Sequence, residues 1–174
     1  MSPSVPTFAE LLAETRGSAV HLETRDVYAV AEEDADFANF RAGKGYDLDD
    51  RKSWWTPFHQ FVSEGVARGV SVRRVRVVSE PVTEYIRYEH AITPQNLAAG
   101  EDVRWLPRSQ ASDLLLPGND LWIFDDRAVK FGIFTGDGGL VGHEMTYDPR
   151  IVGQVADAVA AVWERAVPHK EFQV

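Results

Sequence analysis

The chain of 174 residues contains no cysteine, so it can form neither a disulfide nor a cysteine-ligated metal site, and it has no thiolate nucleophile. It also lacks an apolar run close to the roughly 20 residues that a membrane helix needs. Residues 1–6 have neither the basic nor the apolar segment of a signal peptide. We therefore expect a cytoplasmic protein that makes no contact with a membrane.

Basic residues are scarce relative to acidic ones, with 18 Lys and Arg against 27 Asp and Glu, and the formal net charge is -9. This imbalance opposes direct binding to nucleic acid, because the long-range repulsion acts before any contact forms. The content of hydrophobic residues, 44%, and of aromatic residues, 11%, is typical of a packed core. At this length we predict a single domain over residues 1–174.

The clearest local unit is a helix followed by a strand. Ser53 is expected to cap a helix whose apolar stripe runs from Trp54 to Val66, with Pro57 tolerated in its first turn. Residues 70–78 predict a strand whose alternation slips by one residue near Arg73. The slip indicates either a β-bulge or a strand whose two ends face different layers. A helix should then start near Ser79, and a second short one at residues 93–94.

The second half of the chain is rich in predicted strands. Residues 121–125, a strongly apolar run, 129–134 and 140–147 are separated by turn residues, which predicts an antiparallel meander with two hairpin turns. Residues 148–149 cap a final helix with apolar residues along one face. The predicted fold class is α/β (α+β), with a mixed, largely antiparallel sheet flanked by helices.

Two segments, residues 64–75 and 120–132, resemble the helix–strand and strand–turn–strand units of phospholipase D-like domains. The terminal helix around residues 162–166 is similar to the helix that closes many such domains. The resemblance covers about residues 52–168 and leaves residues 1–51 as an N-terminal extension. Phospholipase D-like catalytic units consist of two similar halves, so this resemblance implies one half and a homodimer.

The enzymes of that family use a His-x-Lys-x4-Asp motif, in which the His attacks phosphorus and the Lys neutralises the phosphate charge. When Asp125 is aligned with the motif Asp, Gly118 occupies the His position and Asp120 the Lys position. Glycine cannot form a phosphohistidine, and an aspartate repels phosphate. The resemblance therefore implies a phospholipase D-like domain without the family's catalytic motif.

The whole chain also resembles an uncharacterised family found mainly in actinobacteria, through residues 19–28, 74–81, 98–107 and 121–126. That resemblance implies association with helix-turn-helix transcription regulators. The preferred interpretation is a non-catalytic regulatory or ligand-sensing domain, an accessory partner of such a regulator. Two alternatives stay open: a phosphoesterase or nucleotide-acting enzyme with a reworked site of Asp125, His143 and Glu144, and a pure protein-interaction module in a toxin–antitoxin or regulator pair.

If the sheet follows the resemblance, one set of residues should flank a cleft and could fix a small polar ligand through a few hydrogen bonds. The set is Tyr85, Tyr88, Glu89, Asn96, Arg104, Trp105 and Asp125. An alternative is that these residues only anchor helix faces and loops.

Arginines concentrate at Arg73, Arg74 and Arg76, and Arg74 and Arg76 should share one strand face. They could form a basic patch for an acidic partner, or they could form ion pairs with the surrounding carboxylates. No two histidines have the spacing of a metal site, and no cofactor motif is present in the sequence, so we expect neither a metal nor a cofactor.

Overall fold

A computed structural model describes residues 5–174 of the chain. Its strands form one seven-stranded sheet in the order β6-β5-β4-β1-β2-β3-β7. Their bounds are Ser18–Glu23 (β1), Ser71–Val78 (β2), Asp102–Pro107 (β3), Leu121–Phe124 (β4), Ala128–Phe134 (β5), Leu140–Thr146 (β6) and Val167–Pro168 (β7). The β1–β2 and β2–β3 pairs are parallel, whereas the other four pairs are antiparallel. The predicted mixed, largely antiparallel sheet and the β4–β5–β6 meander are confirmed.

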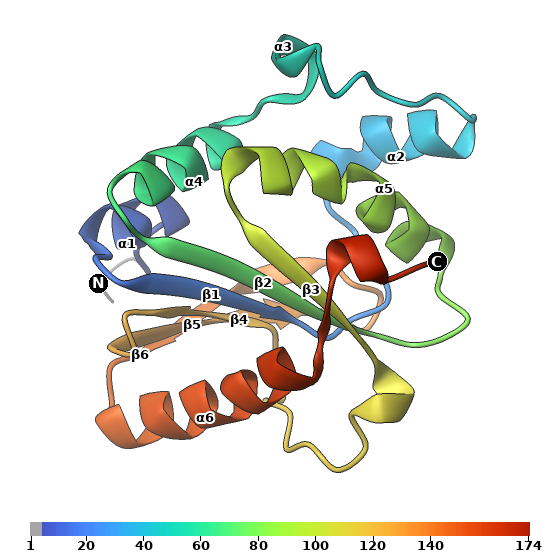
Figure 1. Cartoon of the computed structure of the whole chain (residues 1–174). Helices are drawn as coiled ribbons and strands as arrows, with labels where there is room; N and C mark the ends of the chain where they lie inside the picture. The colour runs from blue at the N-terminus through green and yellow to red at the C-terminus, as the bar shows by residue number, and fades with distance from the viewer. Residues whose placement is uncertain (1–4) are drawn as a thin grey trace.

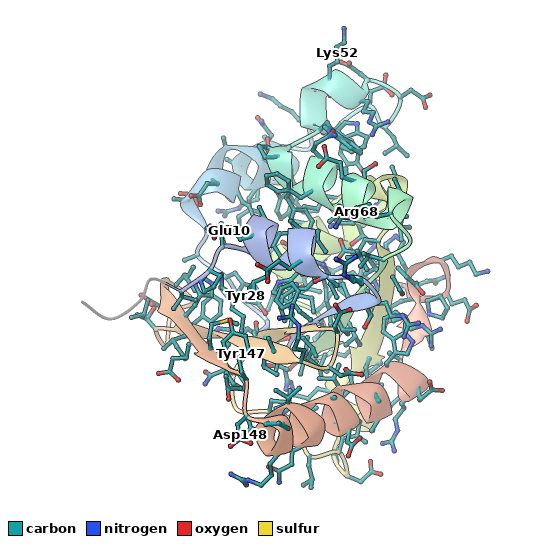
Figure 2. The ribbon with its side chains drawn as sticks, turned by 90° about the vertical axis from the view of Figure 1, so that its left-hand side faces the viewer. Glu10, Tyr28, Lys52, Arg68, Tyr147 and Asp148 are labelled. Carbon is teal, nitrogen blue, oxygen red and sulfur yellow. The ribbon has the colours of Figure 1, made fainter. Side chains whose placement is uncertain are left out.

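Helices cover both faces of the sheet (Figure 1). One face carries α1 (Phe8–Glu14), α2 (Asp34–Arg41), α3 (Arg51–Trp54), α4 (Pro57–Ala67) and α5 (Glu84–Ala99). The opposite face is covered by α6 (Pro149–Arg165), which Figure 2 shows from the side with Asp148 at its start. As predicted, Asp148 caps α6, because its carboxylate accepts a hydrogen bond from the Arg150 backbone N–H at 2.9 Å.

The α6 face is an apolar core. Val152, Val159 and Val162 lie along one side of α6 and pack on the sheet, where they meet Val75 and Leu106. All five are at most 2% exposed. Burial of side chains of this size is the main force that holds the helix to the sheet.

The helix predicted from Ser53 is in fact two helices. Pro57 occupies the first turn of α4, with Thr56 as its N-cap, and the backbone N–H of Thr56 donates to His59 Nδ1 at 3.1 Å. A proline fits the first turn of a helix and disfavours helical conformation in the residue before it. The chain therefore breaks at residues 55–56, and Trp54 ends the separate helix α3.

The helix predicted near Ser79 begins later and does not restart at Pro94. Thr83 is the N-cap of α5, because its hydroxyl oxygen accepts from the Ile86 N–H at 3.1 Å. Pro94 lies inside this helix and removes one backbone donor without ending it. The helix ends at Gly100, whose φ of 99° is a conformation that favours glycine.

The β-bulge proposed for β2 is absent, since β2 pairs with β1 and with β3 without any shift of register. The second alternative is also wrong, because Val72 near one end and Val78 at the other lie on the same face of the sheet, under α4 and α5. Val75 and Val77 pack in the cluster under α6, as ordinary alternation requires. The apparent slip arises because buried Arg74 and Arg76 occupy positions where a hydrophobic residue would keep the alternation.

Residues 1–51 supply more than an extension to the sheet. They include β1, which lies between β4 and β2 in the interior of the sheet. Among residues 5–174, no helix has both the length and the apolar character that a membrane crossing requires.

Candidate functional site

Strand register collects polar residues in two neighbouring rows on the face under α4 and α5. In the first row, His21 of β1 lies opposite Arg74 of β2 on one side and Trp122 of β4 on the other. In the second row, Glu23 lies opposite Arg76. Residues two apart on a strand share a face, so these side chains all project to the same side of the sheet.

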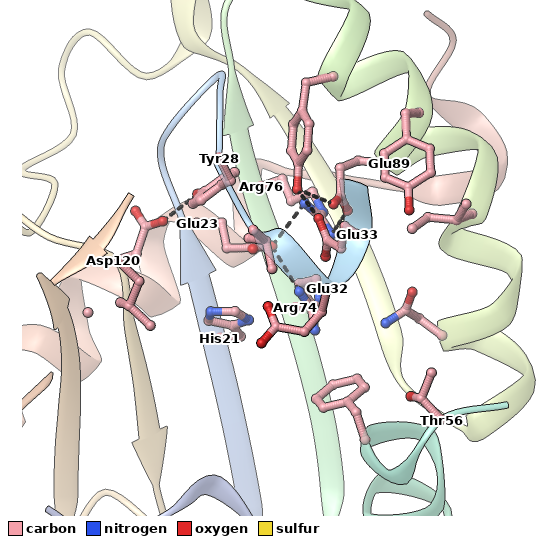
Figure 3. A pocket seen from close by; sticks show the side chains of 18 of the residues that line it. His21, Glu23, Tyr28, Glu32, Glu33, Thr56, Arg74, Arg76, Glu89 and Asp120 are labelled. Carbon is pink, nitrogen blue, oxygen red and sulfur yellow. Dashed lines mark hydrogen bonds and ion pairs between the residues drawn. The ribbon is translucent and has the colours of Figure 1, made fainter. Parts of the chain in front are cut away.

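A cavity of about 860 Å³ lies over these two rows (Figure 3). Its floor comes from β1, β2, β4 and β5, and its sides come from α4, α5 and the segment of η1 (Ala31–Glu33) and α2. Aromatic rings of Trp54, Phe58, Tyr85, Trp122 and Phe134 line it. This volume is in the range of sites that hold small organic molecules.

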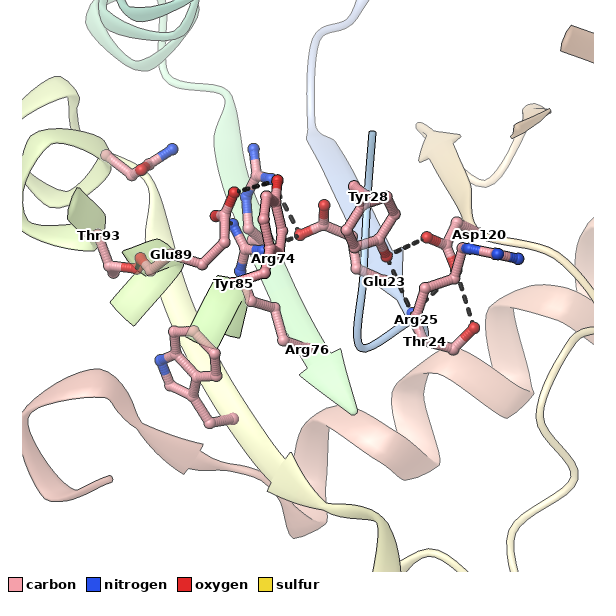
Figure 4. Close-up of polar contacts among 12 residues, drawn as sticks. Glu23, Thr24, Arg25, Tyr28, Arg74, Arg76, Tyr85, Glu89, Thr93 and Asp120 are labelled. Atoms are coloured by element: carbon pink, nitrogen blue, oxygen red, sulfur yellow. Dashed lines mark hydrogen bonds and ion pairs between the residues drawn. The ribbon is translucent and has the colours of Figure 1, made fainter. Parts of the chain in front are cut away.

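A buried ion network forms part of the floor (Figure 4). Glu23 Oε2 lies 3.0 Å from Arg74 Nη1 and 3.1 Å from Arg76 Nη1. Arg74 also pairs with Glu101 at 2.8 Å, and Arg76 pairs with Glu89. Burial by itself would raise the pKa of Glu23, but the charges of Arg76 and Arg74 outweigh it and lower that pKa to about 2. The network therefore holds three carboxylates around two guanidinium groups.

Tyr85 lies between two carboxylates. Its hydroxyl oxygen is 2.6 Å from Glu33 Oε2 and 2.7 Å from Glu89 Oε1. A hydroxyl has one proton, so it donates to one carboxylate and can accept only from a protonated form of the other. Burial and the charge of Glu89 raise the pKa of Glu33 to about 7. Since Glu89 is paired with Arg76, Glu33 is the group that holds the second proton.

His21 is a neutral imidazole in this site. Burial lowers its pKa to about 3, and its ring stacks on Trp122 with the centroids 4.3 Å apart and the planes at 14°. Its Nδ1 atom is buried and has no hydrogen-bond partner among the described residues. A buried polar atom without a partner is costly, and a ligand in the cavity could supply that partner.

Asp120 closes one end of the cavity. Its Oδ1 accepts hydrogen bonds of 2.8 Å from the backbone N–H and the hydroxyl of Thr24, and its Oδ2 accepts from the Tyr28 hydroxyl. Burial raises the pKa of Asp120. These bonds connect the end of β1 to the start of β4. Both carboxylate oxygens of Asp120 therefore already accept hydrogen bonds from Thr24 and Tyr28.

The structure brings together four of the seven residues predicted to fix a ligand. Tyr85, Tyr88, Glu89 and Asn96 line the cavity. The side chains of the other three do not line it and have other partners. Trp105 is fully buried, stacks on Phe172 with the ring centroids 5.3 Å apart and donates a hydrogen bond to His169. The guanidinium of Arg104 lies 4.3 Å from the ring centroid of Trp163. Asp125 lies at the turn after β4.

The three arginines predicted as a basic patch are divided between the two faces of the sheet. Arg74 and Arg76 share the cavity face, as predicted, and both are in buried ion pairs. Arg73 lies on the other side, with its guanidinium 5.3 Å from the ring of Trp163. This geometry corresponds to the ion-pairing alternative for Arg74 and Arg76.

Asp125 anchors the backbone at the start of β1. Its carboxylate accepts from the N–H groups of Arg16, Gly17 and Ser18 at 2.9, 2.7 and 3.0 Å. Partial burial acts to raise the pKa of Asp125, but these three donors outweigh it and hold the pKa below its ordinary value. Of the reworked catalytic set, His143 lines the cavity, whereas Asp125 and Glu144 do not. In the described part of the chain, no three His, Asp or Glu side chains are grouped as metal ligands would be.

The sequence prediction did not assign His21, Glu23, Glu33 or Asp120 to the site. One signal was present, since His21-x-Glu23 and Arg74-x-Arg76 place polar residues two apart within otherwise apolar strands. Such a pattern marks a polar row on a buried face. That the two strands are adjacent, with the rows aligned, depends on a pairing that the sequence does not show.

Nearly the whole chain matches a family model. A family model described as "Domain of unknown function (DUF6879)" matches residues 6–174. The chain belongs to this family. A search of curated proteins gives no match for the DUF6879 chain.

Two solved bacterial structures have a similar fold. Nuc from Salmonella typhimurium, a phospholipase D family member, is 12% identical at a TM-score of 0.50, and the match covers 92% of the DUF6879 chain and 86% of Nuc. NucT from Helicobacter pylori is also 12% identical at a TM-score of 0.50, with 92% and 87% covered. These matches confirm the phospholipase D-like fold.

A third match is TrmBL2, an archaeal chromatin protein, at 14% identity and a TM-score of 0.48. It covers 91% of the DUF6879 chain, which spans about half, 47%, of TrmBL2.

Proposed function

We propose that this DUF6879 domain is a non-catalytic ligand-sensing domain and that the cavity above β1 and β2 is its ligand site. The observation that carries this proposal is the state of the two cavity arginines. Arg74 and Arg76 are each held by two carboxylates, so neither is free to neutralise a phosphoryl group. The alignment of Gly118 and Asp120 with the His and Lys positions of the phospholipase D-like motif supports the same conclusion, since Asp120 is engaged by Thr24 and Tyr28.

We further propose that the domain works in the cytoplasm, as a homodimer and as an accessory partner of a helix-turn-helix regulator. The support for the dimer is the phospholipase D-like fold, of which the chain resembles one half. The support for an indirect role at DNA is the net charge of -9. Sedimentation equilibrium tests the dimer, which a single monomeric species at high concentration would contradict.

Native mass spectrometry of the protein purified from its own host tests the ligand site. We expect a retained small molecule together with the subunit count. The blocking variant is Gln95→Trp, because Gln95 lines the cavity from α5 and its side chain makes no hydrogen bond within residues 5–174. The matched control is Ala98→Trp, an exposed position on the same helix outside the cavity.

Loss of the retained molecule in Gln95→Trp but not in Ala98→Trp supports the site. Equal retention in both variants places the molecule elsewhere and contradicts the proposal. A phosphodiesterase assay tests the non-catalytic part. Turnover that Gln95→Trp abolishes and Ala98→Trp leaves unchanged would show an enzyme.

A further inference from the structure

We propose that the ligand of this cavity is a flat organic cation, of the amidinium, guanidinium or arylammonium class. The inference rests on the proposed ligand site and adds the chemistry of the molecule that it takes. It is carried by the charge balance of the cavity, by two carboxylates without partners and by the aromatic walls.

The cavity has an excess of acidic side chains over basic ones. Six Asp and Glu side chains line it, against three Lys and Arg side chains. The basic side chains are all engaged: Arg74 and Arg76 share the ion network, and Lys130 Nζ donates to the Pro6 carbonyl at 2.7 Å. The acidic side chains outnumber the basic ones, and both arginines already have carboxylate partners, so the cavity should repel an anionic ligand and attract a cation.

Two of the carboxylates have no partner in the part of the chain that the structure describes. Glu32 of η1 and Asp36 of α2 line the cavity but make neither a hydrogen bond nor an ion pair there. Both side chains are exposed, so their charges are hydrated and available. They lie on the segment between β1 and α4 and can pair with a cation that enters the cavity.

The walls favour a flat molecule. The rings of His21 and Trp122, which stack on each other, line the cavity together with Tyr85 and Phe134. Aromatic faces attract cations and stack on planar groups. The buried Nδ1 of the neutral His21 ring, which has no partner within residues 5–174, gives an N–H group of the ligand a hydrogen-bond acceptor in the suitable tautomer.

A probe series with one shape and three charges tests the inference. Benzamidine is a cation, benzamide is neutral and benzoate is an anion, and all three are flat and similar in size. Tryptophan fluorescence reports binding, because Trp54 and Trp122 line the cavity. We expect benzamidine to bind about tenfold more tightly than benzamide, with benzoate weaker still, and its affinity to fall as salt is added.

One variant with its control locates the cation, and a third variant blocks the cavity. Glu32→Gln should weaken benzamidine binding several-fold and leave benzamide binding unchanged. Glu164→Gln, an exposed carboxylate on α6 at the opposite face, should change neither. Gln95→Trp should abolish binding of the whole series.

The outcomes separate this inference from the proposed function. Binding of benzamide or benzoate as tight as that of benzamidine, lost in Gln95→Trp, overturns the cation class and leaves the ligand site standing. No binding of benzamidine also overturns the cation class, and the native mass spectrum then decides the ligand site by itself. Equal effects of Glu32→Gln and Glu164→Gln would show general attraction to an acidic surface and would overturn the assignment to this cavity.

Discussion

The two faces of the sheet are built from the same strands, but one face is an apolar core and the other carries a polar cavity. On the α6 face, Leu22, Val75 and Leu121 meet side by side and are at most 1% exposed. On the cavity face, the neighbouring positions of the same strands hold His21, Arg74 and Trp122. Alternation along each strand therefore separates a dry core from a polar site by a single residue step.

This difference shows where the fold is held and where it can change. The α6 face is stabilised by the burial of apolar side chains, and such close packing leaves no space for a ligand. The cavity face keeps charged groups out of water through ion pairs whose net contribution is small but whose disruption is costly. The four predictions below test this contrast, from the largest expected effect to the smallest.

The largest effect is expected from breaking the ion network on the cavity face. Arg76→Met leaves the buried Glu89 carboxylate without its guanidinium partner, and we expect a loss of about 4 kcal/mol in the free energy of unfolding, measured in urea. The double variant Arg76→Met with Glu89→Met removes both charges and should recover at least half of that loss. A single variant within about 1 kcal/mol of the parent would contradict the network's role.

A truncation on the α6 face should destabilise the fold without touching the site. Leu106 is fully buried in the cluster under α6, so Leu106→Ala should cost about 3 kcal/mol through the lost burial and the cavity left behind. Benzamidine affinity, measured on the folded fraction, should stay that of the parent. A changed affinity would mean that the two faces are coupled and not separate.

Protonation of Glu33 should make stability on the cavity face depend on pH. Its folded pKa of about 7 lies above the ordinary 4.5, so between these values the folded state keeps a proton that the unfolded state releases. Stability should therefore fall by about 2 kcal/mol as the pH rises from 4.5 through 7. Glu33→Gln keeps a donor toward the Tyr85 hydroxyl and should remove this slope, becoming more stable than the parent at pH 8 but not at pH 4.

The control for Glu33 is its neighbour in η1. Glu32→Gln changes a carboxylate that has no hydrogen bond within residues 5–174, so it should retain the parent's pH slope. Thermal unfolding at a series of pH values measures all three proteins. An unchanged slope in Glu33→Gln would refute the assignment of the second proton to Glu33.

The smallest effect is expected at Asp125, which belongs to neither face. Asp125→Asn keeps the shape but loses the charge that accepts three backbone N–H groups, at a cost of about 1 kcal/mol at pH 7. Because the folded pKa is lowered, the parent's advantage should vanish as the pH falls below about 3.8. Asp126→Asn, at the next residue of the same turn, should cost less, and an equal cost would argue against the anchoring bonds.

The sequence predicted the parts of this fold that depend on local signals. The β4–β5–β6 meander follows from short apolar runs and turn residues, and α6 follows from its apolar face and the Asp148 cap, all of which act over short stretches. The division at Thr56 was missed because a proline at position 57 fits the first turn of a helix that starts at Pro57. It also fits the first turn of a single helix that starts after Ser53. Deciding between them requires the cap geometry at Thr56 and His59.

The site was predicted in part for the same reason. Tyr85, Tyr88, Glu89 and Asn96 lie on one helix, so a likeness to a known fold was enough to place them near a cleft. His21 reaches the cavity only because β1 pairs with β2 and β4, which lie about 50 and 100 residues away. A single sequence does not show which distant strands pair. The polar residues that such pairing aligns appear in the sequence only as interruptions of an apolar pattern.

The central place of β1 also constrains the order in which the chain can assemble during synthesis. A ribosome releases residues 18–23 before the other strands of the sheet, yet one edge of β1 has no neighbour until residues 121–124 have emerged. An exposed strand edge can pair with other chains. The open edge of β1 must therefore be kept from such pairing while about a hundred further residues are translated. Any stop or cleavage before β4 would leave a fragment that carries an open strand edge and is prone to aggregate.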